Sequence, residues 1–168
     1  YLLDHGADVT LRGQEHKTPL HYAAHWGLAD IIKRIIDLGG DVRTQDGRAR
    51  FPLHWAAERN HIDAARLLAP GPHVVNEPDV WGDSPLDLAV ARASEPMVIL
   101  LMEAGGNFSI DPDRAAKRID ICVRKRWFEA VTHAIDQVAK APRKREALLN
   151  RAYDTAFFIG DTELVQHL

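Results

Sequence analysis

A short phrase that returns at a fixed interval constrains the fold of this chain more than any other feature. It reads T-P-L-H-Y-A-A from Thr18, F-P-L-H-W-A-A from Phe51 and S-P-L-D-L-A-V from Ser84, at steps of 33 residues. A second phrase keeps the same period and reads G-A-D-V from Gly6, G-G-D-V from Gly39 and G-G-N-F from Gly105. Such a period indicates supersecondary units that stack in a row, because each unit is too small to bury its own apolar face.

Each unit has the signals of two short helices joined by a turn. Thr18 is a suitable N-cap, and Pro19 suits the first helical position because an N–H there has no intrahelical partner. Gly27 is expected to turn the chain, and the second helix should stop at Gly39.

The next two units keep this pattern with altered caps. Phe51 replaces the capping threonine, which costs about 1 kcal/mol unless packing offsets it. Asn60 replaces the turn glycine and is the residue that best tolerates a left-handed conformation after glycine. In the third unit, Ser94 is expected to cap the second helix, with Pro96 in its first turn.

These phrases resemble the ankyrin repeat, whose signature is T-P-L-H-x-A at the same period. The resemblance implies an all-α solenoid of stacked helix–turn–helix units with short hairpin loops and no continuous sheet. We divide the chain into the end of a truncated repeat, three repeats, a degenerate repeat and a second truncated repeat: 1–9, 10–42, 43–75, 76–108, 109–141 and 142–168.

The wording of the phrase decays after Gly105, but its period still places Ile119 and Cys122 at buried positions. The pair Asp111-Pro112 resembles an N-cap followed by proline, so this helix is expected to start early and to replace part of the hairpin. The second helix of that unit should continue as far as Pro142. In the last unit, Ala156 and Gly160 repeat the small buried residue and the turn glycine after a one-residue insertion.

Composition places the chain among folded proteins. It is 46% hydrophobic and 27% charged, its net charge is −3, and no apolar run approaches the roughly 20 residues of a membrane helix. One cysteine, Cys122, cannot form an internal disulfide, so we expect an intracellular and cytoplasmic location, with the nucleus left open. The chain begins and ends inside repeats, so it is expected to be a piece of a longer array with apolar residues exposed at its ends: Leu2, Leu3, Leu164, Val165 and Leu168.

The histidines and the cysteine are the residues that could bind a metal or act in catalysis. His21 and His25 have the i, i+4 spacing of metal ligands on one helical face. However, His21 and His54 occupy the histidine of the phrase, and the resemblance implies that this side chain hydrogen-bonds backbone between neighbouring loops. Cys122, with His133 as its base, lacks any readable oxyanion hole. We therefore expect no metal, no cofactor and no catalysis. We expect Tyr22, Trp55 and Leu88, which share one position, to be core residues.

The two residues after each pair of small residues vary, and the resemblance implies that they line a concave groove together with the hairpin tips. The candidate partner-binding residues are Trp26, His25, Arg48, Arg50, Glu58, Arg59, Trp81, Arg92, Arg124 and Lys125. The second of the two positions reads Trp26, Arg59, Arg92 and Lys125, a basic row with an aromatic residue at one end. The alternative is that these arginines form an ordinary solvated face.

The resemblance favours a non-catalytic module that binds another protein, in particular an acidic segment, through the concave face. Two other readings stay open: binding of nucleic acid or another polyanion by the basic row, and a structural spacer beside an effector domain. Polyanion binding would lose affinity steeply with salt for any sequence tested. A membrane and a small-molecule substrate are not expected as partners.

Overall fold

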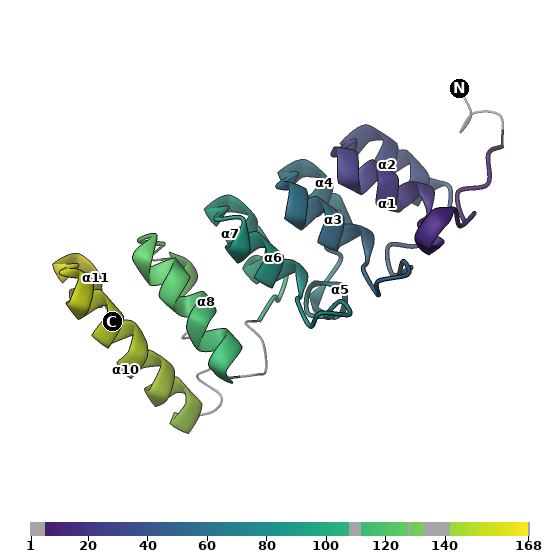
Figure 1. Cartoon of the computed structure of the whole chain (residues 1–168). Coiled ribbons are helices and arrows are strands. Elements are labelled where there is room, and N and C mark those ends of the chain that lie inside the picture. The colour runs from purple at the N-terminus through teal and green to yellow at the C-terminus, as the bar shows by residue number, and fades with distance from the viewer. Residues whose placement is uncertain (1–5, 108–111, 128, 133–141, 168) are drawn as a thin grey trace.

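The computed structural model describes residues 6–107, 112–127, 129–132 and 142–167, and within these ranges all regular structure is helical. The helices follow one another as pairs along one axis, and the two ends of the chain lie at opposite ends of the stack (Figure 1). The all-α solenoid expected from the sequence is therefore confirmed. The unit boundaries remain our division of the sequence, and the predicted course of the helix up to Pro142 lies outside the described residues.

Four helix pairs are described in full, and a fifth unit is described in part. The pairs are α1 (Pro19–Trp26) with α2 (Ala29–Asp37), α3 (Pro52–Arg59) with α4 (Ile62–Leu68), α6 (Pro85–Ala91) with α7 (Glu95–Glu103), and α10 (Pro142–Ile159) with α11 (Thr162–His167). Between α7 and α10 lie α8 (Pro112–Arg124) and a helical stretch at 129–132. Two short elements lie in the loops, the 3₁₀ turn η2 (Gln14–His16) and α5 (Pro72–Val75).

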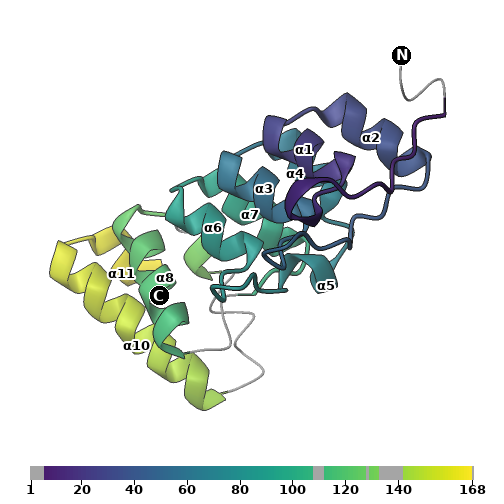
Figure 2. The same cartoon turned by 45° about the vertical axis from the view of Figure 1, so that its right-hand side comes forward.

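The helices form two layers. The first helices α1, α3, α6, α8 and α10 contact one another in that order, and the second helices α2, α4 and α7 contact one another behind them. Figure 2 shows the same succession from another side, with the connecting loops along one side of the stack. The core runs continuously between the layers and includes the small residues at equivalent positions of the units, Ala23, Ala56, Ala89, Cys122 and Ala156.

The start of each first helix follows from the phrase itself. Thr18, Phe51 and Ser84 are extended, and a proline follows each of them. The fourth residue of the phrase then caps the helix by accepting the backbone N–H of the first residue. His21 Nδ1 accepts from Thr18 N at 3.1 Å, His54 Nδ1 from Phe51 N at 3.1 Å, and Asp87 Oδ2 from Ser84 N at 3.0 Å. Phe51 is buried, so packing offsets the missing threonine cap.

The turn after each first helix also repeats. A backbone N–H bonds back five residues to the carbonyls of Ala23, Ala56, Ala89, Cys122 and Ala156, positions spaced by 33, 33, 33 and 34 residues. The turn needs one residue with positive φ: Gly27 (67°), Asn60 (61°), Ala93 (56°), Arg126 (60°) and Gly160 (74°). The expectations for Asn60 and for the shifted Gly160 are therefore confirmed, as are a second helix starting after Ser94 and burial of Ile119.

Several details differ from expectation. Tyr22 is 45% exposed, whereas Trp55 at the same register position is buried. Val165 is half-buried, and the large apolar residues exposed near the end of the stack are instead Phe157 and Phe158, at 72% and 89%. The other apolar residues expected to be exposed lie outside the residues whose side chains are described. The short helix α5 was not expected, because the prolines before it predicted only the end of the preceding helix.

Candidate partner-binding surface

A buried carboxylate folds the hairpin loop before α3, and another folds the hairpin loop before α6. Asp46 Oδ1 accepts the backbone N–H groups of Arg48 at 2.8 Å and Arg50 at 3.0 Å. Asp79 Oδ1 accepts those of Trp81 at 3.0 Å and Asp83 at 3.1 Å in the same way. Each aspartate therefore satisfies two loop donors that would otherwise be left without partners in a buried turn.

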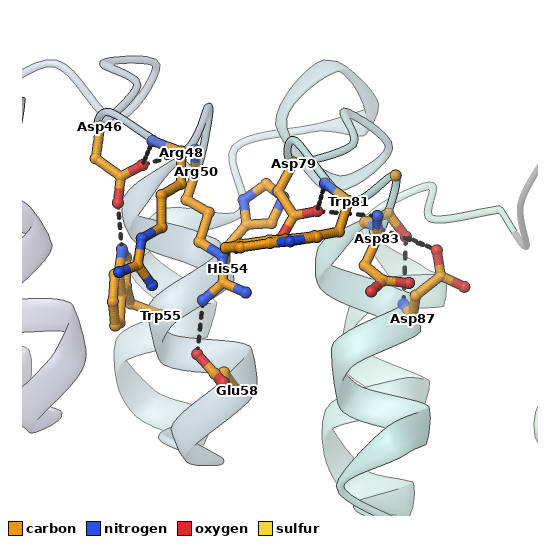
Figure 3. Close-up of polar contacts among 12 residues, drawn as sticks. Asp46, Arg48, Arg50, His54, Trp55, Glu58, Asp79, Trp81, Asp83 and Asp87 are labelled. Carbon is orange, nitrogen blue, oxygen red and sulfur yellow. Dashed lines mark hydrogen bonds and ion pairs between the residues drawn. The ribbon is translucent and has the colours of Figure 1, made fainter. Parts of the chain in front are cut away.

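The second oxygen of each carboxylate ties the loop to a different neighbour. Asp46 Oδ2 accepts the indole N–H of Trp55 at 3.0 Å, which joins the loop to the helix that follows it. Asp79 Oδ2 accepts Arg50 Nε at 2.9 Å, which joins the third unit to the second (Figure 3). The two loops are thus connected through side chains.

Arg50 is the centre of this connection. Its side chain bonds Asp79 and, through Nη1, Glu58 Oε2 at 2.8 Å. Its guanidinium carbon lies 5.3 Å from the ring centroid of Trp55 and 5.0 Å from that of Trp81. Arg50 is only 8% exposed and therefore supports the surface from within. This differs from the sequence-based expectation, which placed Arg50 among the partner-binding residues of the groove.

The cation–aromatic contacts extend on both sides of Arg50. Lys17 Nζ lies 4.4 Å from the ring centroid of Trp55, and Arg48 Cζ lies 5.7 Å from that of Trp81. Cations and indoles therefore alternate in the order Lys17, Trp55, Arg50, Trp81 and Arg48. These contacts fix the hairpin side chains relative to one another, since each ring face attracts a cation.

The residues of the predicted basic row lie at the ends of successive first helices. Trp26 and Arg59 are the last residues of α1 and α3, Arg92 follows α6, and Lys125 follows α8. All four are exposed, Trp26 at 68%. Because the first helices contact one another in order, these equivalent positions succeed one another along the stack.

The charges of this row are unevenly compensated. Arg92 Nη2 lies 3.2 Å from Glu58 Oε1, and Glu58 also pairs with Arg50. In the described part of the chain, Arg59, Arg124 and Lys125 are exposed and make no ion pair. The free positive charge therefore lies on either side of Arg92 rather than on Arg92 itself.

The remaining predicted residues flank the exposed tryptophans. His25 is half-buried, with its ring 5.0 Å from that of Trp26 and 5.2 Å from that of Trp55. Burial and then the charge of Arg59 lower the pKa of His25. Trp81 is 52% exposed at the tip of its hairpin, next to the half-buried Arg48.

The histidines of the phrase have the structural role that the resemblance implied, but only one of them makes the expected link between units. His21 Nε2 bonds the carbonyl of Arg50 at 3.0 Å, which joins the first unit to the second loop. His54 Nε2 is buried and makes no hydrogen bond of normal geometry, although the backbone of Glu77 lies close enough to oppose the shift of its pKa. Burial lowers the pKa of His54 to about 4, so its ring is neutral at pH 7.

The thiol considered as a nucleophile lies in the core. Burial raises the pKa of Cys122 to about 12, so the thiolate is not populated near neutrality. His133 lies outside the described residues. No group of three or more potential metal ligands comes together among the residues that the structure describes.

Sequence reasoning missed two arginines on α8. Arg114 donates to the carbonyls of Gly82 at 2.7 Å and Trp81 at 3.0 Å. Arg118 donates to Asp87 at 3.2 Å and to Asp83 at 3.0 Å. Their i, i+4 spacing and the change of histidine to Asp87 were the available signals, because an aspartate there suits a guanidinium partner.

Fold and surface together define a helical-repeat solenoid whose recurring phrase serves the scaffold and whose exposed positions vary from unit to unit. A family profile described as ankyrin repeats, in three copies, matches residues 27–113, and the chain belongs to that family. Ankyrin repeats are generally protein–protein interaction modules and are typically non-enzymatic. No curated protein matches this sequence. Among the described residues, no helix is both long and apolar enough to cross a bilayer.

Proposed function

We propose that this chain is a non-catalytic binding module that holds an acidic protein segment along the row Trp26, Arg59, Arg92 and Lys125. In the ankyrin architecture, the first helices and the hairpins form the concave face. The single cysteine is consistent with our expectation of an intracellular, cytoplasmic location.

The observation that carries this proposal is exposed positive charge at equivalent positions of three successive units, uncompensated at Arg59 and Lys125, on a chain whose net charge is −3. Arg59 and Lys125 have no competing carboxylate among the described residues, whereas Glu58 already occupies Arg92. We therefore infer that the acidic residues of the partner contact Arg59 and Lys125 first. Several exposed charges of one sign steer association even though each pair contributes little.

Trp26 is the natural apolar anchor, because exposed tryptophans and arginines dominate the energetics of interfaces once a partner buries them. It stands at one end of the row, so the partner segment should place an apolar residue near its own end. Nucleic acid is the less favoured partner, because the acidic residues Glu15 and Glu58 lie among the cations.

Charge reversal tests this proposal. The immobilised protein captures partners from a cell lysate, and the double variant Arg59→Glu with Lys125→Glu should lose them. The matched control reverses Lys33 and Arg66, which are exposed on the second helices α2 and α4, and should retain them. Circular dichroism and melting curves check that both variants fold. Equal capture by both variants would mean that the row is only a solvated face.

A further inference from the structure

A second periodic row lies at the outer ends of the hairpins. Glu15, Arg48, Trp81 and Arg114 are spaced by 33 residues. The side chains of Glu15, Arg48 and Arg114 are 45%, 43% and 41% exposed, and Trp81 as a whole residue is 52% exposed. The first three stand in successive loops, whereas Arg114 comes from the first turn of α8. Neighbours in this row touch: Arg48 pairs with Glu15 at 3.1 Å, and Arg114 donates to the carbonyl of Trp81 at 3.0 Å.

Trp81 is held in place by contacts on every side except its exposed one. Its N–H donates to Asp79, and the guanidinium groups of Arg48 and Arg50 lie against its ring (Figure 3). Its carbonyl accepts from Arg114. The loop itself is tied to the previous one, because Val80 N donates to the carbonyl of Arg48 at 3.1 Å. An exposed aromatic residue that is already ordered loses little entropy when a partner covers it.

Glycine at position 82 is needed for this arrangement. Gly82 has a φ of +80°, and a Cβ there would lie 3.0 Å from Nη1 of Arg114. The left-handed turn therefore lets the guanidinium of Arg114 approach the backbone beside Trp81. The row thus presents an indole between two partly exposed arginines.

We propose that Arg48, Trp81 and Arg114 form a second docking row, which takes an extended peptide with one apolar side chain on Trp81 and one carboxylate on each arginine. Packed helices lie about 8–10 Å apart, and an extended chain advances about 3.3 Å per residue. One unit of the stack therefore corresponds to about three residues of the peptide. We therefore expect a motif in which one acidic residue stands three positions before the apolar residue and another stands three positions after it.

The side-chain chemistry of this row favours this occupant. Guanidinium groups bind carboxylates with two parallel hydrogen bonds, and Trp is the residue type that most often anchors an interface. Each arginine already faces one carboxylate of the chain, Glu15 at 3.1 Å from Arg48 and Asp83 at 3.5 Å from Arg114, so the peptide competes with both. This inference rests on the proposed function as a protein-binding module, but it uses residues outside the row Trp26, Arg59, Arg92 and Lys125.

Fluorescence anisotropy with synthetic peptides tests the inference. The probe is a fluorescein-labelled Gly/Ser peptide with one phenylalanine and an aspartate three residues away on each side. Comparison peptides carry asparagine in place of aspartate, or place the aspartates next to the phenylalanine. The parent protein should bind the probe at least about tenfold more tightly than either comparison peptide. Absence of binding, or equal binding of all three peptides, would overturn the inference.

Variants with opposite expected effects on peptide affinity distinguish a docking surface from general damage to the fold. Trp81→Ala should weaken binding of the probe about tenfold or more, with circular dichroism unchanged. Glu15→Gln should tighten it about two- to threefold, because it frees Arg48, and a merely damaged protein would not bind more tightly. Arg59→Glu with Lys125→Glu should leave most of the affinity. If that variant loses the probe and Trp81→Ala does not, the peptide uses the other row, so this inference fails while the proposed function stands.

Discussion

The junction between the first and second units and the junction between the third and fourth solve the same problem, how one unit holds the next, with opposite hydrogen-bonding polarity. Between α1 and α3 the link is a histidine: His21 Nε2 donates to the carbonyl of Arg50, and Gly47 N donates to the carbonyl of Glu15 at 2.6 Å. Between α6 and α8 the link is an aspartate: Asp87 accepts from Arg118. The neighbour supplies the acceptor in one case and the donor in the other.

The cause of the difference is that α8 occupies the place that corresponds to the folded hairpin of the third unit. Pro112 stands one period after Asp79, the carboxylate that folds the previous hairpin, and it begins a helix instead. A helix at that place offers no loop carbonyl, so a histidine on α6 would have no acceptor there. The arginines of α8 provide donors, and Asp87 is complementary to them. A repeat can therefore exchange one element for another if the facing side chain changes its hydrogen-bonding role as well.

The same carboxylate–guanidinium chemistry continues beyond α8. Asp120 accepts from Arg151 on α10 at 2.9 Å and from the hydroxyl of Thr155 at 3.0 Å. At the start of the stack, histidine and backbone hydrogen bonds therefore act beside ion pairs such as Arg50–Asp79, whereas the junctions of α6 with α8 and of α8 with α10 use carboxylate–guanidinium pairs. This comparison predicts that acid and side-chain exchange will affect the two regions differently.

The largest expected effect is that of acid on the region held by histidines. His54 has a pKa lowered to about 4 by burial, with Asp79 opposing and Arg50 reinforcing that shift, whereas an unfolded histidine titrates near 6.5. The unfolded chain therefore binds a proton at higher pH than the folded chain. The free energy of unfolding should be level above about pH 7, fall by about 3 kcal/mol between pH 6.5 and 4, and then level off as far as His54 is concerned.

Urea unfolding at a series of pH values measures this fall. In the variant His54→Asn, which keeps an acceptor for the N–H of Phe51, most of the fall should disappear. Burial also lowers the pKa of His21, so a smaller decline in the same direction should remain. An unchanged pH profile in His54→Asn would show that His54 is not the group that responds.

Local features of the fold could be predicted from the sequence, because they depend on neighbours in the chain. Thr18 and Pro19 set the start of a helix, and Asn60 accepts the left-handed turn wherever the unit is placed. The period alone placed Ile119 in the core, since equivalent positions of stacked units face the same neighbours.

Contacts between units could not be predicted in the same way. Arg50 looks like an exposed tip residue until Asp79 and Glu58, 29 and 8 residues away, are seen to surround it. Tyr22 and Trp55 share a register position but differ in exposure. Only Trp55 has a carboxylate, Asp46, to receive its ring nitrogen, because the equivalent position in the first unit is Gly13. A fixed period predicts where a side chain lies, but not whether its neighbour complements it.

A smaller effect is expected when the exceptional third phrase is restored to the usual one. Asp87→His keeps a cap for Ser84 but faces the guanidinium of Arg118 with another donor. The loss of one charge-assisted hydrogen bond should destabilise the fold by about 2 kcal/mol in urea unfolding. The isosteric variant Asp87→Asn retains an acceptor and should lose less. A stable Asp87→His protein would mean that the polarity of the two junctions is interchangeable.

The smallest expected effect compares the turns of the two regions. Ala93 adopts a φ of +56° where the first unit has Gly27, and Ala93 is exposed, so no packing is lost when its methyl group is removed. A left-handed conformation costs an L-residue about 1–2 kcal/mol, whereas glycine loses about 0.5–1 kcal/mol more backbone entropy on folding. Ala93→Gly should therefore raise the free energy of unfolding by about 0.5–1 kcal/mol.

The matched control lies two residues earlier. Ala91 is also exposed but is helical, as the last residue of α6, so Ala91→Gly should lower the free energy of unfolding by up to about 1 kcal/mol. Both variants remove one exposed methyl group, so opposite signs in urea unfolding would isolate the backbone conformation as the cause. If Ala93→Gly destabilises the protein as Ala91→Gly does, the turn after α6 does not share the left-handed geometry of the turn at Gly27.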